Sequence, residues 1–277
     1  MQTPNIVLVG HVCIDHNTTE SATYTNWGSS VLYMAKYLQA TYFSVPLVIT
    51  NYGPDIVPYL PAVDMVPDKP NQGQTLVYEN DTRSVPRIWK AHNTEYAEPP
   101  ELTAAVIEAV READIVVVAT LLPNYSPAYV QELLSYAKPS ALRVLCPQGY
   151  LRHIEADGLV TPRRFTEADD IIPLFDLIIF SEEDHPQALK VAQQWQSHNK
   201  DTHFIVTQGP GGASIVTEKE ITAVPTTPLT PEQIIDSVGC GDVFAATALY
   251  DYYQKKDMVS AIKAAHRAAA KKLLSTF

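Results

Sequence analysis

The sequence predicts an α/β protein of three layers, in which helices cover both faces of a mostly parallel sheet. Three observations support this class. Short apolar runs rich in β-branched residues recur along the chain, amphipathic stretches lie between them, and the apolar runs are continuous rather than alternating. Continuous apolar runs are typical of parallel strands that are buried on both faces. Alternation of strands and helices favours a layered α/β domain.

Each strand prediction rests on a short apolar run bounded by turn-forming or polar residues. The first run, IVLVG, is typical of a buried strand near the start of the chain. Five later runs share its composition and length. The predicted strands are residues 6–10, 45–49, 114–119, 142–146, 176–180 and 204–207.

Amphipathic spacing predicts helices between several of these strands. Two further helical stretches occupy the end of the chain. The predicted helices are residues 29–39, 102–112, 128–137, 187–197, 242–256 and 258–275.

Two polar segments interrupt the alternation, within residues 12–26 and 67–95. They are rich in Thr, Tyr and Asn and alternate locally in polarity. Such segments read as extended chain outside the main sheet, and two of them can pair into a small β-lid. Ordinary surface loops are the alternative.

Composition narrows the class of protein. The chain has 277 residues, of which 46% are hydrophobic and 18% charged, which is typical of a globular protein. This length fits one large domain spanning residues 1–277. The formal net charge of -11 argues against nucleic acid or an anionic membrane as the main partner.

The cysteines and the N-terminus indicate a location. Cys13, Cys146 and Cys240 are far apart and form no CxxC pair, so a zinc site is not expected. A low, odd cysteine count suits a reducing compartment. The apolar run at residues 6–10 is too short for a signal peptide or a membrane span. We therefore expect a cytoplasmic protein.

The turn before the penultimate helix is the most informative stretch. Gly239, Cys240 and Gly241 lead into the predicted helix, with Asp242 at its start. A tight turn at a helix N-terminus presents backbone N–H groups, and the helix dipole also favours an anion there. A carboxylate beside such a nest can take the proton of an attacking hydroxyl during phosphoryl transfer. A plain N-cap aspartate after a glycine turn is the alternative.

Residues 236–242 (DSVGCGD) resemble the signature of the ribokinase-like (PfkB) carbohydrate kinases, usually Asp-Thr-x-Gly-Ala-Gly-Asp. Ser237 replaces the usual Thr and Cys240 the usual Ala. The resemblance implies a ribokinase-like fold that uses ATP and Mg2+. It also implies that Asp242 is the catalytic base and that Gly239, Cys240 and Gly241 form the anion hole.

The resemblance extends to the acceptor side. Residues 9–15 are similar to the family's opening strand, whose last aspartate binds acceptor hydroxyls, and this role falls on Asp15. A strand-end turn residue is the alternative. Gly28 and Ser29 stand where the family has two glycines that contact substrate, but the family's later Asn has no match here. Residues 82–85 resemble the lid stretch, in which an Arg often follows a turn.

The donor side is implied by two further segments. Residues 206–213 resemble a Thr-x-Gly-x-x-Gly segment beside the nucleotide, which assigns ATP contacts to Thr207, Gly209 and Gly212. A glycine-rich hairpin turn is the alternative. His266 takes the place of a frequent Asn on a helix that lines the adenine pocket. An exposed helical histidine is the other interpretation.

Two motifs are altered from the family pattern. The sequence has Ser181-x-x-Asp184 where the family has Asn-x-x-Glu, which helps organise Mg2+. Asp184 and Glu183 are therefore the metal candidates, since oxygen ligands suit this cation. An acidic helix N-terminus is the alternative. Residues 145–152 resemble the Asp-Pro-Gln-Gly variant of an inositol-kinase-like branch, with Cys146 in place of Asp, and Arg152 is either an acceptor or phosphate contact or a surface residue.

These patterns leave two functions. The first is an ATP-dependent kinase acting on a sugar or polyol, with inositol as a candidate acceptor. The second is a weakened family member that binds a ligand without turning it over and acts as a sensor or interaction protein. The sequence has neither a P-loop nor a Gly-x-Gly-x-x-Gly after the first strand. The oligomeric state is open, with a homodimer through the lid as one alternative.

Overall fold

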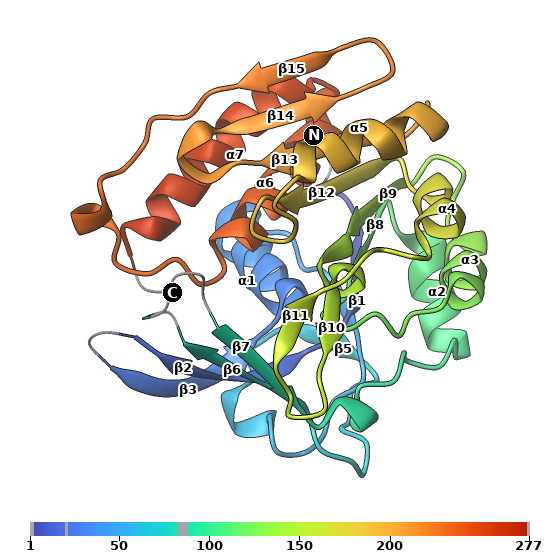
Figure 1. Cartoon of the computed structure of the whole chain (residues 1–277). Helices are drawn as coiled ribbons and strands as arrows, with labels where there is room; N and C mark the ends of the chain where they lie inside the picture. The colour runs from blue at the N-terminus through green and yellow to red at the C-terminus, as the bar shows by residue number, and fades with distance from the viewer. Residues whose placement is uncertain (1–2, 20–21, 82, 84–87, 276–277) are drawn as a thin grey trace.

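The structure is a computed structural model that describes residues 3–19, 22–81, 83 and 88–275. Nine strands form its main sheet (Figure 1), in the order β15-β14-β13-β12-β9-β8-β1-β4-β5. The strands from β13 to β5 run parallel, and β14 and β15 continue the sheet antiparallel at one edge. They are β1 (Ile6–Gly10), β4 (Leu47–Ile49), β5 (Asp64–Val66), β8 (Ile115–Ala119), β9 (Leu142–Cys146), β12 (Leu177–Ser181), β13 (His203–Thr207), β14 (Ala213–Val216) and β15 (Ile221–Val224).

All six predicted strands are present, with small shifts at their ends. The largest shift is at β4, which begins at Leu47 rather than at residue 45. Val45 is 61% exposed, and Pro46 has no N–H to donate to a sheet. β5, β14 and β15 were not predicted.

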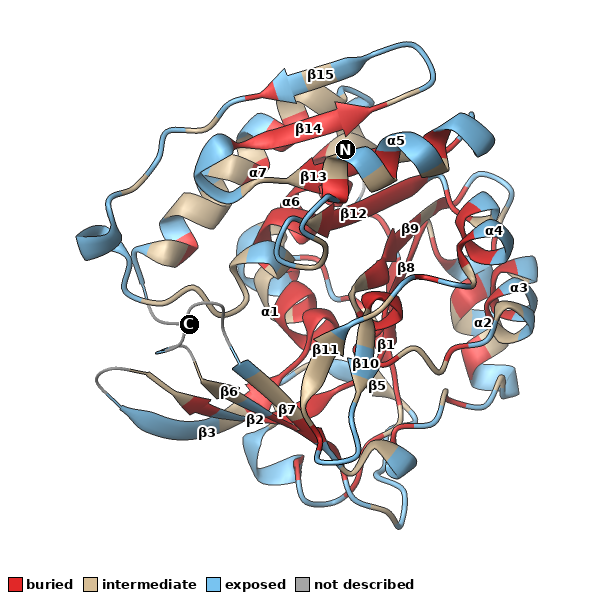
Figure 2. Ribbon diagram, viewed as in Figure 1, coloured by how far each residue is buried: buried red, intermediate tan, exposed pale blue. Residues whose placement is uncertain are grey.

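Helices cover both faces of this sheet. One apolar core joins α1 (Ser30–Tyr42), α6 (Cys240–Lys255) and α7 (Met258–Leu273) to one face, and a second joins α2 (Ala104–Glu112), α3 (Pro127–Ser135), α4 (Ala168–Ile171) and α5 (Ala188–His198) to the other. Along β1, Ile6 and Leu8 belong to the first core, and Val7 and Val9 to the second. Successive strand residues point to opposite faces of the sheet. Because helices cover both faces, the residues of the central strands β1 and β8 are buried throughout (Figure 2). The prediction of three layers is therefore confirmed.

The second sheet is the predicted β-lid. It has the order β3-β2-β6-β7, formed by β2 (Cys13–Thr18), β3 (Thr23–Gly28), β6 (Leu76–Asp81) and β7 (Ile88–His92). β2 follows β1 after two residues, so the chain passes directly from the core into the lid. Of the lid match at residues 82–85, only Arg83 is described, and its guanidinium pairs with the Asp81 carboxylate at 2.6 Å.

A short hairpin, β10 (Arg152–Ile154) and β11 (Val160–Pro162), was not predicted. Its turn touches the lid, where the Ala91 N–H donates to the Gly158 carbonyl at 2.8 Å. Single 3-10 turns complete the described chain: η1 (Val57–Tyr59), η2 (Thr94–Tyr96), η3 (Pro147–Leu151), η4 (Ile172–Leu174), η5 (Gly209–Gly211) and η6 (Pro231–Gln233). Within the described ranges, none of the helices combines the length and the apolar character that crossing a bilayer requires.

Candidate active site

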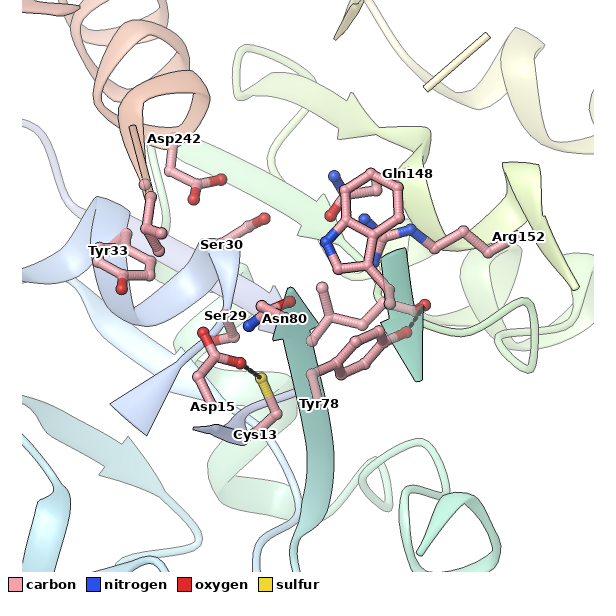
Figure 3. Close-up of a pocket in the computed structure, with 14 residues that line it drawn as sticks. Cys13, Asp15, Ser29, Ser30, Tyr33, Tyr78, Asn80, Gln148, Arg152 and Asp242 are labelled. Carbon is pink, nitrogen blue, oxygen red and sulfur yellow. Dashed lines mark hydrogen bonds between the residues drawn. The ribbon is translucent and has the colours of Figure 1, made fainter. Parts of the chain in front are cut away.

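A cleft lies between the lid and the carboxyl ends of the central strands, where ligands commonly bind in open α/β sheets. The lid, the start of α1, the η3 turn and the start of α6 each contribute side chains to it. Figure 3 shows Asp242 and Asp15 on one side of this cavity and Gln148 and Arg152 on the other. Segments that are distant in sequence therefore meet in one place.

Asp15 enters the cleft from β2 and is almost fully buried, at 6% exposure. Burial raises the pKa of Asp15 to about 6, while hydrogen bonds from Cys13 and Asn80 oppose the rise. The Cys13 thiol donates to Asp15 Oδ1 at 3.3 Å. A Cβ on Gly28 would lie 2.2 Å from the Asp15 carboxyl carbon, so glycine at this position leaves room for the carboxylate.

Ser29, the N-cap residue of α1, has a strained backbone conformation. Its φ of 116° lies in a region that residues other than glycine rarely adopt, and glycine is the residue that the family resemblance leads us to expect at this position. The Ser29 hydroxyl accepts a hydrogen bond from the Leu32 N–H at 3.3 Å, and this N-cap interaction offsets part of the strain. Strained residues of this kind concentrate at functional sites.

The glycine turn before α6 has the geometry of an anion nest. Gly239 has φ of 76°, and a Cβ there would lie 2.6 Å from the Tyr33 ring. α6 then begins at Cys240, two residues earlier than predicted. The Cys240 N–H donates to the Ser237 carbonyl at 3.2 Å. The N–H groups of Gly241 and Asp242 lie in the first helical turn, where a helix provides no internal acceptor.

Of the three predicted anion-hole residues, Cys240 therefore has its N–H engaged by the turn itself. Gly241 has open space in front of it, because a Cβ built there meets no described atom within 4 Å. An anion placed at this point would face the N-terminus of α6, where the positive end of the helix dipole stabilises negative charge.

Asp242 is partly buried at the mouth of this nest. Burial raises the pKa of Asp242 to about 6, a hydrogen bond with Ser30 lowers it, and the nearby charge of Asp184 raises it further. Near neutral pH the carboxylate is ionised, yet its pKa is high enough to accept a proton efficiently. A carboxylate that can accept a proton and helix amides that can bind an anion are thus neighbours.

The Arg152 side chain lies on the opposite wall of the cleft. The Arg152 guanidinium lies over two aromatic rings of the lid, 5.5 Å from the centre of Tyr78 and 5.2 Å from that of Trp89. It lowers the pKa values of both Asp15 and Asp242, although burial outweighs it. Arg152 therefore lines the cleft and is not an isolated surface residue.

The two metal candidates line a smaller depression that shares Gln148 and Arg152 with the cleft. Asp184 is held in place: its Oδ2 accepts from the Ser181 N–H at 2.9 Å and hydroxyl at 2.8 Å, and its Oδ1 accepts from Gln148 at 3.1 Å. No group of three acidic, His or Cys ligands occurs in the described part of the chain. Asp184 and Glu183 fit a Mg2+ ion that is held by one or two carboxylates, with phosphate and water as its other ligands.

The residues predicted to contact the nucleotide lie around the turn that joins β13 to β14 and on the part of α7 beside it. Gly212 has φ of 94°, and a Cβ there would lie 2.4 Å from the Val224 carbonyl oxygen. The His266 Nε2 donates to the same carbonyl at 3.0 Å, and burial lowers the pKa of His266. Gly212 thus belongs to the turn between β13 and β14, whereas Gly209 has open space on its side-chain face. The ATP contacts assigned to both residues stay predictions. Thr207 ends β13 beside them.

Several residues of the cleft escaped the sequence prediction. Gln148 lies in the segment that resembles the Asp-Pro-Gln-Gly variant, but no sequence pattern indicated that its side chain reaches Asp184. Five others lie in the lid or at the start of α1, where local pattern gives no direction for a side chain. These cleft residues are Ser30, Tyr33, Tyr78, Asn80 and Trp89.

The structure has three features of the ribokinase-like fold. It has a three-layer α/β core, a β-lid over the cleft, and a glycine turn that places helix N–H groups beside a carboxylate. The comparisons with known proteins identify the family. A model described as pfkB family carbohydrate kinase matches residues 63–276. The chain belongs to this family.

Solved structures resemble the whole chain at low identity. A pyrophosphate-dependent kinase of the ribokinase family, in a sulfate complex, is 17% identical with a TM-score of 0.78, and the match covers 97% of this chain and 95% of that one. Adenosine kinase from Schistosoma mansoni is 13% identical with a TM-score of 0.74, over 100% and 96%. Ribokinase from Arabidopsis thaliana is 14% identical with a TM-score of 0.71, over 100% and 94%. No curated protein matched the sequence.

Proposed function

We propose that this protein transfers the γ-phosphoryl group of ATP to a hydroxyl of a small polyhydroxylated acceptor, a sugar or a polyol such as inositol. One observation carries the proposal: the Asp242 carboxylate lies beside the first-turn amides of α6 and shares the cleft with the buried Asp15. A base, an anion site and a hydroxyl-binding carboxylate are the groups that such a transfer requires.

Each group has a defined task in this mechanism. Asp15 accepts a hydrogen bond from one acceptor hydroxyl and orients the ring. Asp242 accepts the proton of the attacking hydroxyl, and the N–H groups of Gly241 and Asp242 stabilise charge on the transferred phosphoryl group. Mg2+, held near Asp184, would neutralise charge on the donor phosphates.

The neutral acceptor is favoured by the charge of the cleft. Asp15 and Asp242 are ionised near neutral pH, and Arg152 is the positively charged residue among the described residues of the cleft lining. Among the described residues that line the cleft, two carboxylates face one guanidinium, and this excess of negative charge favours a neutral polyol over an acceptor that already carries phosphate.

The test is a turnover assay with purified protein and Mg2+ on a panel of sugars, polyols and nucleosides. ATP and pyrophosphate are compared as donors, because three of the similar structures are described as pyrophosphate-dependent kinases. Phosphorylation of a polyol by ATP is the expected result. Acceptor binding without turnover on either donor would favour the sensor function instead. Pairing of two copies through the lid stays a prediction, which the mass in solution would test.

The first expected result concerns pH. Asp242 has a pKa of about 6 and acts only when deprotonated, so kcat/KM should rise with pH through about 6 and level off above 7. Asp15 titrates in the same range, so the acid limb should be steeper than tenfold per pH unit. A pH–rate profile checks this. A flat profile between pH 5 and 7 would contradict the assignment of both carboxylates.

The second expected result concerns Asp15. Asp15→Asn removes a charge-assisted hydrogen bond worth roughly 1.5–3 kcal/mol, so the acceptor KM should rise about 10- to 100-fold. The KM for ATP should change little. Steady-state kinetics with each substrate varied separately would show the difference. An equal rise in both KM values would mean that Asp15 does not select the acceptor.

A further inference from the structure

A buried lysine lies behind the glycine turn and belongs to none of the sequence motifs. Lys272, in the last turn of α7, is 5% exposed. Its ammonium donates to Asp236 Oδ2 at 2.8 Å, to the Asp236 carbonyl at 3.3 Å and to the Ser275 carbonyl at 3.5 Å. Lysine is rarely buried unless its charge is paired, and here the partner is the first residue of the glycine-turn motif.

Asp236 connects this lysine to the turn. While its Oδ2 binds the ammonium, its Oδ1 accepts from the Val238 N–H at 2.9 Å. The backbone adds a second attachment, because the Ile235 N–H donates to the Leu273 carbonyl at 2.8 Å. The end of α7 therefore holds the segment that leads into Gly239 from both its side chain and its main chain.

The charge of Lys272 also acts on the start of α6. Burial raises the pKa of the Cys240 thiol to about 11, and the nearby Lys272 ammonium opposes that rise. The ammonium is thus close enough to α6 for its field to favour negative charge at the helix N-terminus.

We propose that Lys272 is a positioning residue for phosphoryl transfer: by holding Asp236 it fixes the glycine turn, and the turn aims the first-turn amides of α6 at the transferred group. The inference rests on the proposed function. Donors fixed in advance stabilise charge in the transition state without reorganising. A turn released from Lys272 would present the same amides for only part of the time.

The experiment compares Lys272→Met with Lys271→Met, because Lys271 precedes it on α7 and is exposed. Lys272→Met should lower kcat about 10- to 100-fold, a fraction of the effect of losing a whole oxyanion donor. It should also weaken the binding of inorganic pyrophosphate, with the acceptor KM within twofold of the parent. Lys271→Met should change none of these. A lower melting temperature with unchanged kcat would reduce Lys272 to a structural role and overturn the proposal.

A double-mutant cycle tests the route through Asp236. Asp236→Asn keeps an oxygen that can accept from the Val238 N–H but removes the charge that binds Lys272. If Lys272 acts through Asp236, its replacement should cost little more kcat in the Asp236→Asn protein, so the two losses should not add. Additive losses would overturn the proposal. If the parent protein phosphorylates no acceptor, the proposed function fails. Pyrophosphate affinity measured by calorimetry on the same variants still decides whether Lys272 positions the anion-binding amides of α6.

Discussion

Asp242→Asn is expected to lower turnover by roughly 10²- to 10⁴-fold, the usual contribution of a general base. Asparagine keeps the size of the side chain and its hydrogen-bonding capacity towards Ser30, but it cannot take the proton of the acceptor hydroxyl. ATP affinity and acceptor KM should change little, because the nest and Asp15 are untouched. Single-turnover measurements with the preferred acceptor would separate the chemical step from binding.

The stability of this variant provides a control. The folded-state pKa of Asp242 is raised from 3.8 to about 6, so the native state binds the proton more tightly than the unfolded chain. Its contribution to stability is therefore largest at acidic pH and is lost as the pH rises through 4 to 6. Asp242→Asn should melt at the same or a higher temperature at pH 7. Asp170→Asn, an exposed site on α4, should leave turnover unchanged, and near-normal turnover in Asp242→Asn would refute the mechanism.

Gly241→Val should abolish most activity by filling the anion site, with a loss of roughly 10²-fold or more, comparable to losing an oxyanion donor. A Cβ at Gly241 meets no described atom within 4 Å, so the branched side chain projects into the open space in front of the amides. Valine costs less than about 1 kcal/mol in a helix, so the fold should persist. Calorimetry with ATP and with pyrophosphate should show weakened donor binding.

Gly241→Ala is the matched control, because a single methyl group occupies less of the same space. Its loss of activity should be clearly smaller than that of valine. If Gly241→Val bound the donor and turned over normally, the transferred phosphoryl group would have to lie elsewhere, and the role assigned to the α6 amides would be wrong.

Local sequence determined the class of fold and the glycine turn. Strands such as β1 and β8 are continuous apolar runs, and the composition of each run by itself predicts a strand that is buried on both faces. The nest also depends on neighbours in sequence, because Gly239 must adopt a positive φ immediately before a helix. The edge strand β5 and the hairpin β10–β11 escaped prediction because they are only three residues long and partly exposed, so hydrophobic periodicity does not mark them.

Only the tertiary structure decided which side chains meet in the cleft. Asp15 and Asp242 come from opposite ends of the chain, and their pKa values rise because the packed lid and α6 bury both carboxylates. Gln148 and Arg152 reach the cleft because parallel strands end at one edge of the sheet. Lys272 carries no local signal at all: it is one of two adjacent lysines near the end of α7, and burial against Asp236 alone distinguishes it from Lys271. Periodicity describes neighbours within a segment, whereas these contacts depend on how separate segments pack, a long-range property that no local pattern encodes.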